Sequence, residues 1–93
     1  MADTANSKYL GSWKGVSMTA LGKTEPLTVD NTIVLRADGT AVYTTPDETR
    51  AYIWKETDYG VFLDGKADLK LKADGDKLTT RVLGFVTINF EKQ

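Results

Sequence analysis

The side chains that could do chemistry in this 93-residue chain are few, because it contains neither histidine nor cysteine. Thiol chemistry, disulfides, imidazole and thiolate metal ligands and the usual general base near neutral pH are therefore excluded. The best remaining carboxylate pairs, Asp47 with Glu48 and Glu56 with Asp58, fall in expected exposed turns. A catalytic acid needs burial or a like-charged neighbour to shift its pKa. We therefore expect no enzymatic activity and no cofactor.

Metal ions, nucleic acid and membranes are not expected partners either. The run Asp74-Gly75-Asp76 resembles the opening of a calcium loop, but the later ligands and the closing glutamate are absent. We expect a turn there and no metal site. Twelve basic against thirteen acidic residues give a formal net charge of −1. Such a chain has no charge excess to attract nucleic acid or acidic lipid.

The elements that would position any site are expected to be strands. Turn signals recur roughly every ten residues, a spacing typical of an all-β meander. They are Asp38-Gly39, Pro46-Asp47, Asp58, Asp64-Gly65, Asp74-Gly75 and Gly84.

The strand registers follow from the turns, since residues opposite each other across an antiparallel pair point to the same face. A three-residue loop at 37–39 places Leu35 opposite Ala41 and Ile33 opposite Tyr43. Loops at 46–49, 55–58, 64–66, 74–77 and 83–85 extend the same face. The further predicted pairs are Tyr43 with Tyr52, Ala41 with Trp54, Trp54 with Tyr59, Tyr52 with Val61, Leu63 with Ala67, Val61 with Leu69, Leu71 with Thr80, Leu69 with Val82, Val82 with Val86, Thr80 with Ile88, and Leu78 with Phe90.

One apolar face thus runs through seven strands, and residues 13–20 supply an eighth. Eight short antiparallel strands remove their edges by closing into a barrel. We predict a small all-β, up-and-down eight-strand barrel, closed or nearly closed. A β-sandwich is the main alternative, because a sheet folded over on itself would also carry apolar residues on both faces.

The start of the first strand resembles a known family. Gly11-Ser12-Trp13, opening an eight-strand meander, is similar to the glycine-x-tryptophan signature of lipocalin-like, calycin-type barrels, here in the form of small bacterial domains. The resemblance implies that Trp13 closes the barrel floor and that a basic residue on the last strand covers its ring. Lys92 holds the matching position, with a stem able to lie on the indole.

Two candidate sites follow from the registers. Tyr43, Tyr52, Trp54 and Tyr59 point inward on adjacent strands, which predicts a shallow pocket for a small apolar or aromatic ligand, with Arg50 at its rim opposite Leu63. Buried tyrosines need hydrogen-bond partners, so a polar lining is implied. The alternative is that these aromatics are structural. The many bulky inward side chains should nearly fill an eight-strand interior, which argues against a deep lipid cup.

The second site is a stripe on the outer face, in which Val34 pairs with Val42, Val42 with Ile53, and Ala51 with Phe62. A contiguous apolar patch often marks a partner site. We expect either a partner protein, most simply a second copy in a symmetric dimer, or a cover formed by the loop at 20–27.

The chain is expected to be a single domain over 1–93, with residues 1–6 flexible. Leu83 and Phe85, on either side of Gly84 at a hairpin tip, are expected to plug a barrel end, with a small protruding contact as the alternative. Because MADTANSK lacks the apolar stretch of a signal peptide, we expect a cytoplasmic protein as written; a secreted or cell-surface position stays open if a leader or parent protein was removed. The expected function is a non-catalytic binding module. The alternative is a structural accessory domain of a larger bacterial system, with no ligand of its own.

Overall fold

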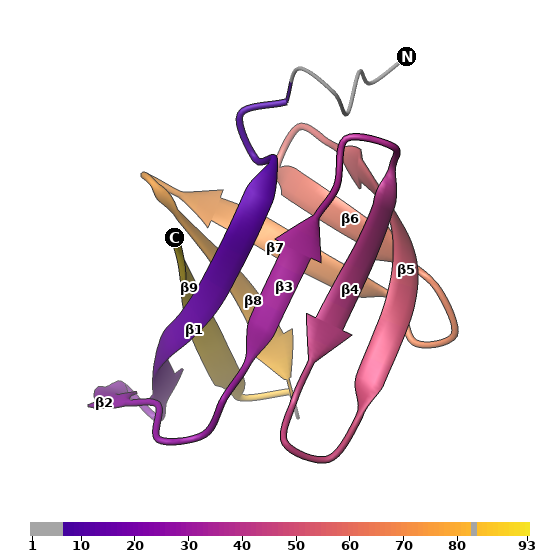
Figure 1. Cartoon of the computed structure of the whole chain (residues 1–93). Helices are drawn as coiled ribbons and strands as arrows, with labels where there is room; N and C mark the ends of the chain where they lie inside the picture. Colours follow the sequence, from indigo (N-terminus) through magenta and orange to yellow (C-terminus); the bar gives the residue numbers. More distant parts are fainter. Residues whose placement is uncertain (1–6, 83) are drawn as a thin grey trace.

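The computed structural model describes residues 7–82 and 84–93, and every element in that part of the chain is a strand (Figure 1). The expectations for residues 1–6 and for Leu83 lie outside the described residues. The strands are β1 (Gly11–Ala20), β2 (Lys23–Pro26), β3 (Thr32–Leu35), β4 (Thr40–Thr44), β5 (Thr49–Glu56), β6 (Gly60–Asp64), β7 (Leu69–Asp74), β8 (Lys77–Val82) and β9 (Val86–Lys92).

Eight of these strands form the predicted closed barrel. The strands β3 to β9 follow one another as antiparallel neighbours, and β1 joins both ends of the series. Its first part, Gly11–Lys14, pairs with β3, while Trp13–Ala20 pairs with β9. The expected up-and-down barrel is confirmed, and the pairing of β1 with β9 excludes the open sandwich.

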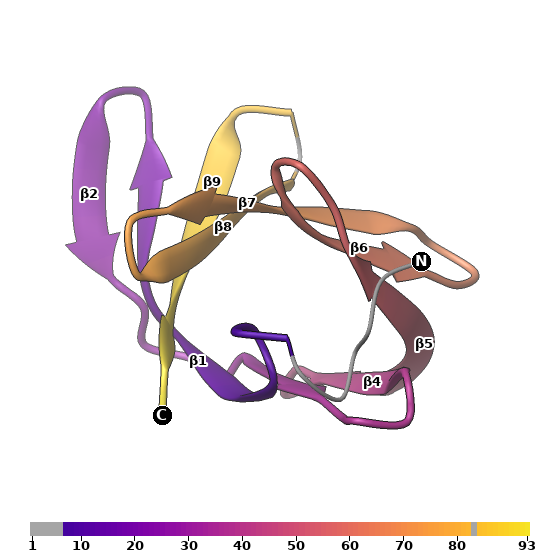
Figure 2. The same ribbon diagram turned by 90° about the horizontal axis from the view of Figure 1, so that it is seen from above.

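Strand β2 is an addition that the sequence did not predict. A register shift between Gly15 and Ser17 bends β1, and its last four residues pair with Lys23–Pro26. Residues 20–27 are therefore a β-hairpin on β1, and the expectation that they cover the stripe on β3 to β5 is wrong. The hairpin extends beyond the barrel wall, with the end of β1 between β2 and β9 (Figure 2).

The core lies inside the barrel and follows from the alternation of apolar and polar residues along the strands. In β3 and β4, every second side chain is buried. The largest fully buried side chains are Trp54, Phe90, Ile33, Leu35, Leu63, Leu71, Leu78 and Val61. Within the described residues, no helix is long and apolar enough to span a bilayer.

The predicted registers are correct at both ends of the series. Leu35 lies opposite Ala41 and Ile33 opposite Tyr43, as expected. The β8–β9 ladder is also as predicted, with Leu78 opposite Phe90 and two further predicted pairs. The β7–β8 offset is correct as well, but only three residues of each strand pair, and the strands separate before Leu71 and Thr80.

The registers on either side of β5 are wrong by an even number of residues. Tyr43 lies opposite Arg50 instead of Tyr52, and Ala41 lies opposite Tyr52 instead of Trp54. The cause is the turn, which occupies 45–48 and is closed by a hydrogen bond from Thr45 N to Glu48 O of 2.9 Å. It begins one residue earlier than predicted.

The next two turns show the same kind of error. Trp54 lies opposite Leu63 rather than Tyr59, and the following turn places Leu63 opposite Leu69 and Val61 opposite Leu71. Tyr59 is not in a strand at all, because the turn closes between Thr57 and Gly60. An even displacement keeps each side chain on its predicted face, which is why the core is correct although these pairs are not.

Candidate functional site

The strongest candidate site is a groove beside the start of β5, where Tyr52 reaches under the loop at 65–67. Tyr52 is buried, and its hydroxyl donates a hydrogen bond of 3.0 Å to the carbonyl of Ala67. Gly65 lies against the ring, since a Cβ at this position would stand 2.7 Å from Tyr52 Cδ1. The missing side chain of Gly65 therefore allows the loop to pack on the tyrosine.

Arg50 lies two residues before Tyr52 on the same side of β5 and brings a positive charge to this groove. Its Nη2 is 2.5 Å from Glu48 Oε1, and 43% of its side chain is exposed. Hydrogen bonds with Glu48 and, secondarily, with Tyr52 raise the pKa of the guanidinium above its usual value. Arg50 is thus paired with Glu48 while much of its surface faces water.

Tyr43 supports this end of the barrel from the neighbouring strand, directly opposite Arg50. It is buried, and its hydroxyl donates to Asn31 Oδ1 at 2.6 Å. Burial raises the pKa of the Tyr43 phenol, so the hydroxyl stays a donor. Sequence reasoning missed Asn31, a buried polar residue just before β3, because an asparagine before a strand reads as an ordinary turn residue.

The groove has a volume of about 450 Å³ and combines a short apolar surface with charged walls. It is lined by Glu48, Arg50, Ala51, Tyr52, Lys66 and Ala67. Two of these side chains are cations and one is an anion, so the groove carries a formal charge of +1. A pocket of this size accommodates a small organic molecule.

The structure brings together only part of the predicted aromatic pocket. Arg50 and Tyr52 meet at the groove, and Tyr43 stands next to them, but Arg50 is opposite Tyr43 rather than Leu63. Trp54 is fully buried, with its Nε1 donating to the carbonyl of Arg36 at 2.8 Å. The placement of Tyr59 in a common pocket is wrong, because it sits in the β5–β6 turn.

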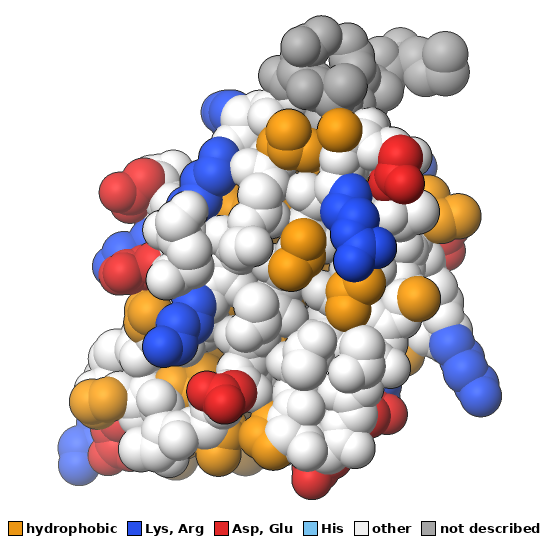
Figure 3. Space-filling model, viewed as in Figure 1, with side chains coloured by type: hydrophobic (Ala, Val, Ile, Leu, Met, Phe, Trp, Pro, Cys, Tyr) orange, Lys and Arg blue, Asp and Glu red, His pale blue; other side chains and the backbone are white. Residues whose placement is uncertain are grey.

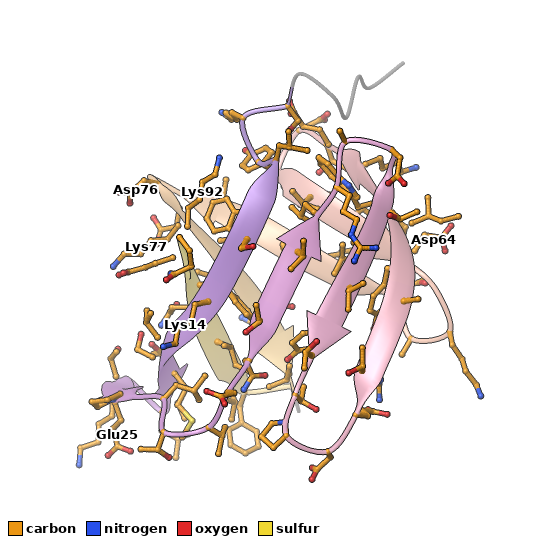
Figure 4. The ribbon with its side chains drawn as sticks, viewed as in Figure 1. Lys14, Glu25, Asp64, Asp76, Lys77 and Lys92 are labelled. Atoms are coloured by element: carbon orange, nitrogen blue, oxygen red, sulfur yellow. The ribbon has the colours of Figure 1, made fainter. Side chains whose placement is uncertain are left out.

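Trp13 and Lys92 show the contact that the family resemblance implies. They are opposite each other across β1 and β9, and Lys92 Nζ lies 6.0 Å from the indole centroid. The same ammonium donates to the carbonyl of Lys8 at 3.0 Å, and Trp13 Nε1 donates to that of Tyr9 at 2.9 Å. Lys92 lies near Asp76 and Lys77 (Figure 4). The three residues line part of a second groove of about 310 Å³.

The outer stripe is present on β3 to β5 but ends sooner than predicted. Val34 is opposite Val42, as expected, while Val42 is opposite Ala51 instead of Ile53. Ile53 lies opposite Thr40 and is 66% exposed. Hydrophobic side chains lie over this face between charged ones (Figure 3).

Phe62 does not extend the stripe as predicted. Its neighbours across the ladders are Lys55 and Lys70, not Ala51. The Lys55 ammonium lies 5.6 Å from the centre of its ring. Phe62 is thus covered by a lysine and separated from the stripe.

The remaining candidates lie at the surface. Phe85 is 60% exposed, so its predicted role as a plug is wrong. Asp47, Glu48, Glu56 and Asp58 are all exposed, and Glu56 accepts a hydrogen bond of 2.6 Å from Ser7 Oγ. Within the part of the chain that the structure describes, no group of three acidic side chains is placed to hold a metal ion.

Comparison of the chain with family models, with curated proteins and with solved structures gave no match. Inferences about its function therefore depend on the geometry and chemistry of the groove and of the outer surfaces.

Proposed function

We propose that this chain is a non-catalytic binding module whose groove at Arg50 takes a small molecule with a carboxylate group and a short apolar or aromatic body. The closed barrel, with Trp13 beneath Lys92, is compatible with a small lipocalin-like domain of bacterial type, and the proposal includes that assignment. Its main support is the position of Arg50, which is paired with Glu48 at the wall of the groove, two residues before Tyr52.

The chemistry of a guanidinium favours a carboxylate at this place. Arginine has five N–H donors in a planar fork, and a pair of partners leaves several of them for a ligand. Tyr52, Ala51 and Ala67 would cover one side of the ligand's apolar body. The filled barrel interior supports binding at this surface groove rather than within a deep cup.

The acidic partner of Arg50, Glu48, limits the expected affinity for a ligand. Glu48 occupies part of the guanidinium, so a ligand carboxylate competes with it for the same charge. Binding at an open groove of this kind should be weak, with a dissociation constant of about 1 mM or somewhat below, as for a few charge-assisted contacts. Replacing Glu48 with glutamine should strengthen it.

The test is an NMR titration of the ¹⁵N-labelled protein with benzoate, indole-3-acetate and hexanoate, each paired with its neutral amide. We expect shifts at Arg50, Ala51 and Ala67 with the acids, much weaker shifts with the amides, and at least tenfold weaker binding in Arg50→Gln. Lys14→Gln, which removes one positive charge from the outer face of β1, is the matched control and should bind as the unmodified protein does. If none of the acids shifts the groove, or if the two variants behave alike, the accessory-domain alternative is favoured and the proposal fails.

A further inference from the structure

Two separate surfaces hold most of the exposed large hydrophobic side chains of the described residues. These side chains are Leu21, Val29, Ile53 and Phe85. Ile53 belongs to the stripe on β4 and β5, whereas Leu21 and Phe85 lie at neighbouring hairpin ends. Grouped exposed apolar residues often mark a contact with another molecule.

Leu21 is the clearest anomaly of the four. It is 88% exposed and occupies the first central position of the β1–β2 turn, with a φ of 52°, followed by Gly22 with a φ of 80°. Positive φ at both central positions is the pattern of a type I′ turn, which favours Asn-Gly. A leucine is strained in this conformation and gains no burial here, so neither local structure nor packing explains it.

Phe85 and Leu21 lie in turns at the paired ends of β9 and β1. Ala20 is opposite Val86 across the β1–β9 ladder, which brings the 21–22 turn toward the turn residues Gly84 and Phe85. We call Leu21 and Phe85 the tip pair. The nearest cations along the chain are Lys23 and Arg81, both exposed, while Glu25 lies two positions farther along β2.

The stripe on β4 and β5 is also apolar, but the charge around it is opposite to that of the cations near the tip pair. A shallow groove of about 580 Å³ runs over Val42, Ala51 and Ile53, with Arg36, Asp38 and Asp64 among its other lining residues. Two carboxylates and one guanidinium give this surface a formal charge of −1. Asp38 is fixed by hydrogen bonds of 3.0 and 2.7 Å from the Thr40 amide and hydroxyl.

The two surfaces face away from each other. Seen from above, the β1–β2 turn and the start of β9 lie on one side of the barrel, and β4 lies on the opposite side (Figure 2). A contact between a tip pair and a stripe is therefore impossible within one chain but possible between two copies. Because the surfaces are different and opposed, such a contact repeats from copy to copy and does not close on itself as a symmetric dimer does.

We infer that the chain self-associates head to tail, with Leu21 and Phe85 of one copy seated on the Val42–Ile53 stripe of the next. Apolar burial supplies the attraction, and the cations beside the tip pair face the carboxylates beside the stripe. Two side chains cover far less than the about 1,600 Å² of a standard stable interface. The association should therefore be weak and reversible, and visible only at high protein concentration.

The test is sedimentation velocity from micromolar to millimolar concentration, on the unmodified chain, Leu21→Asn and Ile53→Lys. We expect the average mass of the unmodified chain to rise past that of a dimer, and each variant to associate at least about tenfold more weakly, as loss of one buried large side chain implies. Val29 is the fourth exposed large hydrophobic side chain and belongs to neither surface, so Val29→Asn is the matched control. It should associate as the unmodified chain does.

Mixing the two variants identifies the geometry. Leu21→Asn keeps an intact stripe and Ile53→Lys keeps an intact tip pair, so their mixture should form a one-to-one dimer that grows no further. With only Leu21→Asn labelled with ¹⁵N, amide shifts should appear at Val42 and Ile53. A monomer at millimolar concentration, a mixture that stays monomeric, or association lost in Ile53→Lys but kept in Leu21→Asn would each overturn the inference. Circular dichroism of both variants verifies that they are folded.

Discussion

Replacement of Leu21 by asparagine should make the folded monomer more stable, although it removes a hydrophobic residue. At a φ of 52°, the leucine Cβ crowds the following carbonyl, which costs roughly 1 kcal/mol or somewhat more. Asparagine tolerates this conformation and is favoured before glycine in a type I′ turn. Because Leu21 is 88% exposed, its removal sacrifices almost no burial.

The expected gain is about 0.5–1 kcal/mol in the free energy of unfolding. For a domain of this size, about 1 kcal/mol shifts the melting temperature by roughly 4–8 °C, so Leu21→Asn should melt about 2–8 °C higher. Urea and thermal unfolding, followed by tryptophan fluorescence at low micromolar concentration, measure the monomer without contribution from self-association.

The control for this prediction is Leu21→Ala, which removes the exposed side chain but keeps the crowded Cβ. It should leave the stability within about 0.5 kcal/mol of the unmodified chain, as exposed substitutions usually do. If Leu21→Asn were no more stable than Leu21→Ala, the backbone of this turn would not be strained, and the case for Leu21 as a contact residue would lose its main support.

Three further changes test the packing around the groove and at the closed end. Gly65→Ala would place a Cβ 2.7 Å from the Tyr52 ring, so it should destabilise the fold by about 1–3 kcal/mol in urea unfolding and weaken benzoate binding in NMR. Tyr43→Phe leaves the buried Asn31 Oδ1 without its donor and should cost about 1–3 kcal/mol. Because burial raises the pKa of Tyr43, its contribution to stability is full below the ordinary tyrosine pKa and falls as pH rises through the folded-state value; the phenylalanine variant should therefore lose less stability at alkaline pH. Trp13→Phe loses the hydrogen bond to Tyr9 and should melt lower.

The barrel was predictable because burial determines which face each side chain takes. Alternation from Ile33 to Phe90 defines one interior, and every strand from β3 to β9 keeps its predicted inner face. Tyr59 is the exception, because an aromatic residue in step with the alternation can equally be the last residue of a turn. Nothing local distinguishes the two cases until the β5–β6 register is known.

Strand β2 was not predictable from its own composition. Lys-Thr-Glu-Pro has no apolar alternation, and all four residues are exposed. The strand forms because β1 continues past the end of β3 and offers unpaired backbone groups to the chain that turns back at Leu21-Gly22. The usual sequence signal for such a turn is Asn-Gly, and here leucine stands in place of the asparagine, so the signal is absent.

The neighbours of Arg50 and Ile53 were beyond sequence reasoning for a more general reason. A turn that begins one residue early moves the pairing by two positions, which keeps the face of every side chain but changes the residue beside it. The hydrophobic pattern determines only the face that each side chain takes and not its neighbour, since both registers bury the same residues. The displacement put Arg50 opposite Tyr43 and Ile53 opposite Thr40 instead of Val42. The separate β5–β6 turn placed Asp64 on the other side of Ile53. Both proposals depend on these neighbours, because the ligand groove is built from Arg50 and Tyr52 on one side of β5, and Ile53 can receive a partly cationic surface only beside an acidic residue.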